Sequence, residues 1–478
     1  MKIKSLLVLL LALTIAKSNA QPFQYPVSRK TDQTDVYFGT TVADPYRWLE
    51  DDRSAETSKW AQEQNSVTEN YLKNIPFRNQ VKARMTALWN FPKWSVPFKG
   101  GSNYYVYTNN GLQNQFVLNK LASLKDKPSI FLDPNTLSSD GTVNINSVVV
   151  SKNGNYMAYM TSSAGSDWSE ISIRDTRTGQ DLADKISWVK FSEIAWKGNG
   201  FYYSRYDAPD ASQVLKGKNE YHKVYYHTIG KPQSQDELIY QDTLHPLRNY
   251  SAGITSDERF LIITGSEGTS GNNLIVKDLS KAKSVFTVIE PEFNNDISVI
   301  DNDSTKLLVL TNKDASNYRF VRIDANYPGL KWTEIVPAKK DVLQEATVGN
   351  GFIICKYLQD AKSELKAFTK SGKEAFGIPL ETIGTVDQLS ANKDDENLFY
   401  SLTTFTAPTT IFKYNLKTRK QEIFFRPKSD FKSINYTTEQ VFYNSKDGTK
   451  IPMFIVHKKD ITLDGNNPTL LFGYGGFN

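Results

Sequence analysis

The sequence predicts a mainly β fold built around a seven-bladed β-propeller, with a segment of different character on each side of it. Between about residues 95 and 425, short runs of Tyr, Phe, Val and Ile alternate with turns rich in Gly, Asn, Asp and Ser, as in strands joined by tight turns. A turn followed by an aromatic or aliphatic strand returns seven times, at intervals of about 45 to 60 residues. A repeat of this length is typical of a propeller whose blades are four-stranded sheets.

Each repeat is marked by its turn. The seven turns begin at Gly101, Asn153, Gly198, Asp257, Asp303, Gly349 and Asp395. Second signals of the same kind lie between them, such as residues 173–179 (IRDTRTG), and we interpret these as hairpins in the outer half of a blade. A pair of β-sandwiches is the alternative, but the regular long period argues against it.

The first twenty residues have the layout of a secretory signal peptide. Lys2 and Lys4 precede an apolar run at residues 6–16, and small residues at 18–20 (SNA) follow it. The run has about 11 residues, whereas a helix that spans a bilayer needs about 20. We therefore expect an exported protein, periplasmic or extracellular, that begins near Gln21 and has no membrane segment.

Residues 21–89 differ from the repeats because they predict helices. Trp60, Gln64, Val67 and Tyr71 recur near a 3.6-residue period, which favours a helix over residues 57–72. A second helix is expected over residues 78–89, where it would end before Pro92.

Composition excludes several classes of function. The chain has 57 Lys and Arg against 52 Asp and Glu, with no basic block interleaved with aromatics, so we expect no nucleic-acid partner.

The single cysteine, Cys355, follows an apolar run that raises a thiol pKa, and we interpret it as core packing. No histidine pair has zinc-like spacing with a third ligand, so no metal and no cofactor are expected. The four histidines, interpreted as surface or blade residues, are His222, His227, His245 and His457.

Residues 431–478 change character again. A hairpin is expected around residues 446–448 (KDG), followed by a short apolar strand at 468–472 (PTLLF) and a Gly-rich stretch at 473–478 (GYGGFN). In α/β-hydrolases an apolar strand leads into a loop whose backbone N–H groups help to form the oxyanion hole. A flexible terminus would have a similar composition, so this pattern by itself leaves both interpretations open.

Several motifs, taken in order, resemble those of the prolyl oligopeptidase family of serine peptidases, from about residue 22 to the last residue. They are residues 44–51 (DPYRWLED), 111–115 (GLQNQ), 131–135 (FLDPN), 165–168 (GSDW), 445–453 (SKDGTKIPM) and 473–478 (GYGGFN).

The resemblance implies a seven-bladed propeller inserted into an α/β-hydrolase domain, and cleavage of short peptides on the carboxyl side of proline. It divides the chain into a signal peptide (1–20), an N-terminal segment of the hydrolase domain (21–89), the propeller (90–430) and the truncated start of the α/β-hydrolase domain (431–478). We expect a monomer whose ligands are short proline-containing peptides.

Two site residues follow from the resemblance. Tyr474 matches the tyrosine whose hydroxyl donates to the oxyanion, and Phe477 matches an aromatic that lines the proline pocket. A hydroxyl placed where negative charge develops lowers a barrier by about 3–4 kcal/mol, and an aromatic face suits the ring of proline. The alternative is that both are buried aromatics at the end of a strand.

The catalytic serine, aspartate and histidine are expected beyond Asn478, because that is their order in such enzymes. Residues 100–103 (GGSN) superficially resemble the serine motif, but Ser102 lacks the closing glycine and begins a propeller repeat. No complete G-x-S-x-G occurs in the chain. We therefore predict no prolyl peptidase activity from this chain alone.

Three functions remain open. In the favoured hypothesis, the chain is the first part of a prolyl endopeptidase, and the remainder, in the same polypeptide or in a separate chain, supplies the triad. The second is a non-catalytic, secreted β-propeller that binds peptide or protein. The third is a remnant without function.

Overall fold

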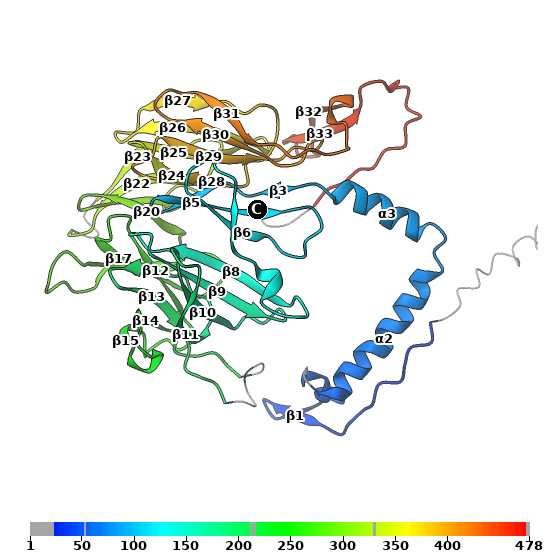
Figure 1. Ribbon diagram of the computed structural model, residues 1–478, viewed down its shortest axis with the longest axis horizontal. Helices are drawn as coiled ribbons and strands as arrows, with labels where there is room; N and C mark the ends of the chain where they lie inside the picture. Colours follow the sequence, from blue (N-terminus) through cyan, green and yellow to red (C-terminus); the bar gives the residue numbers. More distant parts are fainter. Residues whose placement is uncertain (1–22, 52–53, 211–213, 215–216, 328–330, 475–478) are drawn as a thin grey trace, which may run out of the picture. The chain divides into compact units, whose positions relative to one another are not determined.

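The computed structural model describes residues 23–51, 54–210, 214, 217–327 and 331–474 (Figure 1). The signal peptide expected at residues 1–20 lies outside them, as does Phe477. The chain divides into two compact units, Met1–Leu88 and Trp89–Asn478, and each is described by itself.

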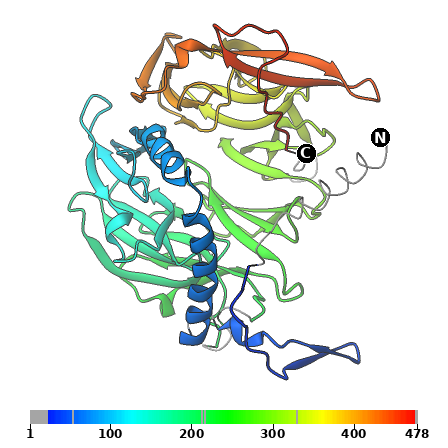
Figure 2. The same cartoon turned by 90° about the vertical axis from the view of Figure 1, so that its right-hand side faces the viewer.

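The first unit contains the expected helices. A hairpin of β1 (Thr34–Tyr37) and β2 (Thr40–Ala43) and the 3-10 helix η1 (Arg47–Glu50) precede α2 (Ala55–Lys73) and α3 (Arg78–Trp89) (Figure 2). α2 begins two residues earlier than the pattern predicts, because Ser54 accepts a hydrogen bond of 3.1 Å from the Thr57 N–H and so caps the first turn.

The second unit is mainly β. In its described residues, strands β3 to β31 form one five-stranded, one eight-stranded and four four-stranded sheets, all of whose strand pairs are antiparallel. The five-stranded sheet consists of β3 (Lys93–Trp94), β4 (Phe98–Gly100), β5 (Asn103–Asn109), β6 (Val117–Leu121) and β7 (Ser129–Leu132). The eight-stranded sheet consists of β8 (Val143–Val150), β9 (Tyr156–Ser163), β10 (Ser169–Asp175), β11 (Asp181–Val189), β12 (Ala195–Lys197), β13 (Gly200–Arg205), β14 (Lys223–Thr228) and β15 (Glu237–Gln241).

The four-stranded sheets follow in chain order. They are β16 (Asn249–Ile254), β17 (Phe260–Ser266), β18 (Asn273–Asp278) and β19 (Thr287–Glu290); β20 (Ile297–Asp303), β21 (Lys306–Thr311), β22 (Arg319–Asp324) and β23 (Trp332–Val336); β24 (Val342–Gly349), β25 (Phe352–Gln359), β26 (Lys362–Thr369) and β27 (Glu374–Ile378); and β28 (Leu389–Ala391), β29 (Asn397–Leu402), β30 (Thr410–Asn415) and β31 (Gln421–Phe425). In each of these sheets, strands adjacent in sequence pair with one another, which is how a propeller blade is built.

The turns that mark the sequence repeats join neighbouring strands and also touch one another. Gly101, between β4 and β5, has φ +61°, and a Cβ there would lie 2.6 Å from the Cα of Gly154, between β8 and β9. Two glycines therefore let the turns of successive sheets approach more closely than side chains would allow.

The core lies between the faces of successive sheets. One apolar cluster joins β16–β19 to β20–β23 and includes Phe260 and Val309, and another joins β20–β23 to β24–β27 and includes Phe320 and Ile353. A further cluster joins the last sheet to the first, through Phe399 on β29 and aromatic residues of β3 and β5. Apolar packing therefore continues from sheet to sheet and returns to its start, as in a propeller.

The strand expected at residues 468–472 is not formed. β32 (Tyr436–Asn444) and β33 (Lys450–Lys458) make a long hairpin, as the sequence predicts, but the chain after it has no strand up to residue 474. Leu470, Leu471 and Phe472 are 89 %, 83 % and 82 % exposed. An apolar strand needs neighbours to pair with and to cover it, and none of the described strands pairs with this segment.

No described helix is long and apolar enough to cross a membrane.

Candidate functional site

Tyr474 lies in an extended, exposed segment rather than in a formed site. Its side chain is 77 % exposed, and the apolar residues just before it are exposed as well. An oxyanion hole requires donors held in place in a site that excludes water. In the described residues the Gly-rich segment does not have this form, so the role of Tyr474 stays a prediction, as does that of Phe477.

The hairpin before this segment is held against the loops of two sheets. Lys362 Nζ donates to Gln440 Oε1 at 3.1 Å, and Gln440 Nε2 donates to the carbonyl of Asp360. The rings of Phe405 and Phe454 lie 5.2 Å apart. The polypeptide therefore leaves the last sheet through an anchored hairpin, whose turn is shaped by Gly448 at φ +84°.

The histidines form no nucleophile–base pair, since no serine hydroxyl contacts a histidine in the described part of the chain. His222 donates through Nε2 to the carbonyl of Lys190 and accepts the Tyr250 N–H at Nδ1, both at 2.9 Å. Burial lowers its pKa to about 4, so it is a neutral structural residue. His245 contacts a neighbouring aspartate and arginine, and His457 contacts a backbone carbonyl.

His227 is the centre of a buried ionic cluster that sequence analysis did not find. Its Nδ1 lies 2.7 Å from Asp236 Oδ1 and its Nε2 lies 3.0 Å from Asp184 Oδ1. His227 is fully buried. Asp236 also accepts from Tyr203 Oη at 2.6 Å, and Asp184 accepts from the Gly230 N–H at 2.6 Å. Because both ring nitrogens face carboxylates, the cluster favours the imidazolium, and its role is structural.

Cys355 is fully buried in the core between β20–β23 and β24–β27. Burial raises the pKa of its thiol to about 12, so the reactive thiolate is scarce at neutral pH. The interpretation of Cys355 as core packing is confirmed.

We expect the thiol of Cys355 not to react with a water-soluble maleimide at pH 7.5 while the chain is folded, and to react fully in 6 M guanidinium chloride, because only unfolding exposes it. Intact-mass spectrometry after timed labelling measures this. Rapid modification of the native chain would contradict it.

One cavity is lined by β8, β12, β16 and β20, each of which is the first strand of four that follow one another in the sequence. It has a volume of about 670 Å³. Its charged groups include Glu193, whose pKa is raised by burial, and Glu258, which pairs with Lys197 at 3.4 Å. A cavity of this size and mixed polarity can accommodate a small molecule or part of a peptide, but it holds no nucleophile–base pair.

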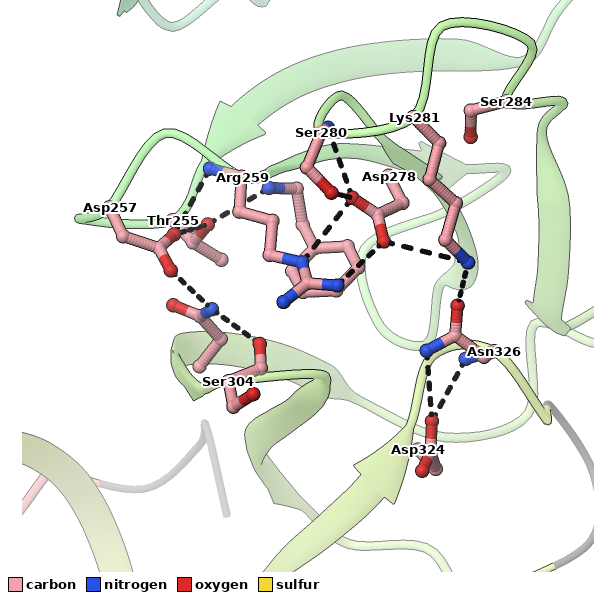
Figure 3. A network of polar contacts seen from close by, with 12 residues as sticks. Thr255, Asp257, Arg259, Asp278, Ser280, Lys281, Ser284, Ser304, Asp324 and Asn326 are labelled. Atoms are coloured by element: carbon pink, nitrogen blue, oxygen red, sulfur yellow. Dashed lines mark hydrogen bonds and ion pairs between the residues drawn. The ribbon is translucent and has the colours of Figure 1, made fainter.

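Polar contacts join the sheet β16–β19 to the sheet β20–β23, near the turns that connect their strands (Figure 3). Lys281, after β18, pairs with Asp278 at 3.8 Å and donates to Asn326, which follows β22. Asp257 accepts from Nδ2 of Asn302 on β20 at 2.7 Å.

The described residues contain no group of three or more His, Cys, Asp or Glu side chains that could hold a metal ion.

This architecture, a mainly β chain of successively packed antiparallel sheets, is that of a β-propeller protein. The family model described as the N-terminal β-propeller domain of prolyl oligopeptidase matches residues 25–426. The prolyl endopeptidase of Elizabethkingia meningoseptica is 42 % identical over 97 % of this chain and 66 % of its own length, and that of Elizabethkingia miricola is 41 % identical over 100 % and 68 %. The chain belongs to the prolyl oligopeptidase family.

Two solved structures of prolyl oligopeptidases are also similar to this chain. A structure from a study of two prolyl endopeptidases has a TM-score of 0.74 and 33 % identity, over 95 % of this chain and 66 % of that one. Prolyl oligopeptidase B of Galerina marginata, bound to a 25-residue macrocyclisation substrate, has a TM-score of 0.81 and 28 % identity, over 93 % and 66 %. The chain thus spans about two thirds of the length of these relatives.

Proposed function

We propose that this chain is the propeller-bearing, N-terminal portion of a serine endopeptidase that cleaves short peptides after proline. The observation that carries the proposal is the similarity to a prolyl endopeptidase at 42 % identity over 97 % of the chain. We further propose an exported protein with a signal peptide at residues 1–20, in which residues 21–89 and 431–478 belong to one hydrolase domain. Tyr474 and Phe477 serve its oxyanion and proline sites once that domain is complete.

The proposed propeller has seven blades. The four-stranded sheets supply four. The eight-stranded sheet counts as two, since β8–β11 and β12–β15 are joined by a single residue pair, Val189 with Arg205. The five-stranded sheet counts as one, with β3 as an addition to β4–β7. This division supports the seven sequence repeats.

The chain by itself is proposed to be catalytically inactive. A serine peptidase needs a nucleophile within hydrogen-bond reach of its base, and the contacts of the described histidines include no serine. Binding and positioning of peptide are the contributions left to this portion.

We expect the purified chain to release no p-nitroaniline from a proline-containing peptide p-nitroanilide above the rate in buffer. A full-length relative, assayed in parallel as the control, is expected to hydrolyse the same substrate. Addition of a separately produced segment that carries the remaining third of a relative is expected to restore hydrolysis. Activity of this chain alone that is lost when one of its histidines is substituted would contradict the assignment of the catalytic groups to the remaining third.

The second candidate is a non-catalytic propeller that binds peptide or protein. The cavity of about 670 Å³ along the first strands favours it. Two results together would favour this function over the first. A proline-containing octapeptide would bind to this chain at equilibrium, and the remaining third of a relative would fail to restore hydrolysis.

A further inference from the structure

A smaller cavity lies apart from the one along the first strands. It has a volume of about 460 Å³ and is bordered by residues of β20, β21, β22, β24 and β25, and of the turns after β26 and between β28 and β29. Leu308, Val348, Phe352 and Ile353 give it an apolar wall. Its size is within the range of pockets that bind small molecules.

Arg322 lines this cavity and has no anionic partner. It lies on β22 opposite Leu308, and Leu308 packs in the core between the two sheets. Arg322 is half-buried, yet no carboxylate in the described residues lies within 4.0 Å of its guanidinium. A guanidinium partly removed from water gains from an anion that supplies the lost hydrogen bonds.

The other cations of the cavity are already paired. Lys370 Nζ lies 3.3 Å from Asp303 Oδ1, and Lys393 Nζ lies 3.1 Å from Asp301 Oδ2. Arg322 is therefore the cation that a ligand's carboxylate would meet without displacing an existing ion pair.

Asn302 borders the cavity but presents no accessible acceptor to it. It is fully buried and lines the cavity, and its Nδ2 donates to Asp257 Oδ2 at 2.7 Å and to the Ser304 carbonyl at 2.9 Å. Both of these partners are acceptors, so the amide cannot be turned round, and Oδ1 remains buried with no hydrogen bond. Figure 3 shows Asp257 and Ser304 on either side of this amide contact. A ligand in the cavity cannot reach this buried oxygen, so Asn302 takes no direct part in binding.

A negative group at the rim complements Arg322. Asp394 borders the same cavity, is exposed, and has no cation within 4.0 Å among the described residues. An unpaired cation and an unpaired carboxylate beside an apolar wall match the groups of a zwitterion that has an apolar body.

We propose that this cavity binds a small apolar zwitterion, an amino acid or a dipeptide. Its carboxylate pairs with Arg322, its ammonium faces Asp394, and its side chain lies on Val348 and Phe352. The site is separate from the first-strand cavity and does not depend on peptidase activity.

Isothermal titration of the purified chain with four probes tests the proposal. Leucine, or the dipeptide Leu-Leu, is expected to bind at least about 10-fold more tightly than leucinamide, which lacks the carboxylate, and than 4-methylpentanoate, which lacks the ammonium, because each charge-assisted hydrogen bond contributes about 1.5–3 kcal/mol. Leucine tighter than Leu-Leu identifies an amino-acid site, and the reverse order identifies a dipeptide site.

Variants locate the binding. Arg322→Gln is expected to weaken binding at least about 10-fold, Arg322→Lys to weaken it less, and Arg177→Gln, which changes an exposed arginine paired with Asp175, to leave it unchanged. The probe series needs no variant, so it still decides if Arg322→Gln does not fold. Failure of leucine and Leu-Leu alike to bind at 10 mM, equal affinity for leucinamide, or full binding by folded Arg322→Gln would overturn the proposal.

Discussion

Replacing His227 with glutamine is expected to destabilise the chain by about 3–5 kcal/mol, because it removes the cation of a buried ionic cluster and leaves its carboxylates uncompensated. His227 lies between Asp236 at 2.7 Å and Asp184 at 3.0 Å, and the side chains of all three are at most 4 % exposed. Glutamine has one amide nitrogen, so it cannot donate to both carboxylates from the positions of the two ring nitrogens. The midpoint of urea unfolding, followed by tryptophan fluorescence, measures the loss.

The effect should depend on pH. Burial opposes the charged ring, but hydrogen bonds to Asp236 and Asp184 outweigh it, so the pKa of His227 is raised above 6.5. A raised pKa contributes stability that is complete below the unfolded value of about 6.5 and is lost as pH rises through the folded value. The stability difference between the unmodified chain and His227→Gln is therefore expected to shrink steadily above pH 6.5.

His245→Gln is the matched control. His245 also contacts a carboxylate, Asp242 at 2.8 Å, but its side chain is 48 % exposed, so the same substitution is expected to cost less than about 1 kcal/mol. Equal unfolding midpoints for the two variants, or a His227→Gln effect that grows as pH rises, would contradict the buried imidazolium.

The sequence predicted the fold well because its signals are local. A turn followed by an apolar strand is written in consecutive residues, and turns such as Asn153 and Asp395 do join the first two strands of four-strand segments. The helix predicted at residues 57–72 differs from α2 by two residues at its start and one at its end. Periodicity predicts the body of a helix, whereas its first residue depends on the capping side chain of Ser54.

The buried cluster around His227 was harder to predict, because its residues are distant from one another in the sequence. Asp184 is 43 residues from His227, and they come together only because β11 and β14 lie on either side of β13 in one sheet. The family motif at residues 473–478 predicted an oxyanion loop, but the structure leaves Tyr474 exposed, since a motif specifies a loop only together with the strands around it. The unpaired Arg322 gave no signal in the sequence at all.

Closure of the last sheet onto the first depends on side chains. In the described residues, no strand of β28–β31 pairs with a strand of β3–β7. The polar links are few: Gln388 accepts the Val96 N–H at 3.0 Å, and Asp395 accepts from Lys99 Nζ at 3.2 Å and from Tyr104 Oη at 3.0 Å. Apolar packing must therefore supply most of the stability of this junction.

Phe399 lies at the centre of that packing. It is 3 % exposed, and its ring meets those of Tyr104 and Phe424 edge-on, at 6.4 and 5.4 Å. Phe399→Ala is expected to cost about 3–5 kcal/mol, the usual effect of truncating a buried phenylalanine. In the described residues the two sheets share no backbone pairing, and no segment of chain leads directly from one to the other. The loss should therefore open this junction before the rest unfolds, and limited proteolysis should cut within β3–β7 or β28–β31 sooner than in the unmodified chain.

Phe405→Ala removes the same side chain from a nearby position that is 61 % exposed, so the free energy of unfolding should change by less than about 1 kcal/mol. Urea unfolding compares the two variants, and mass spectrometry of timed digests locates the first cuts. A Phe399→Ala variant as stable as Phe405→Ala would show that the polar links close the ring without the aromatic cluster. A large loss of stability with first cuts elsewhere would show that the junction is not its weakest point. With both expected results, the junction between β28–β31 and β3–β7 is the place where the sheets separate first, because no segment of chain leads directly from one of these two sheets to the other.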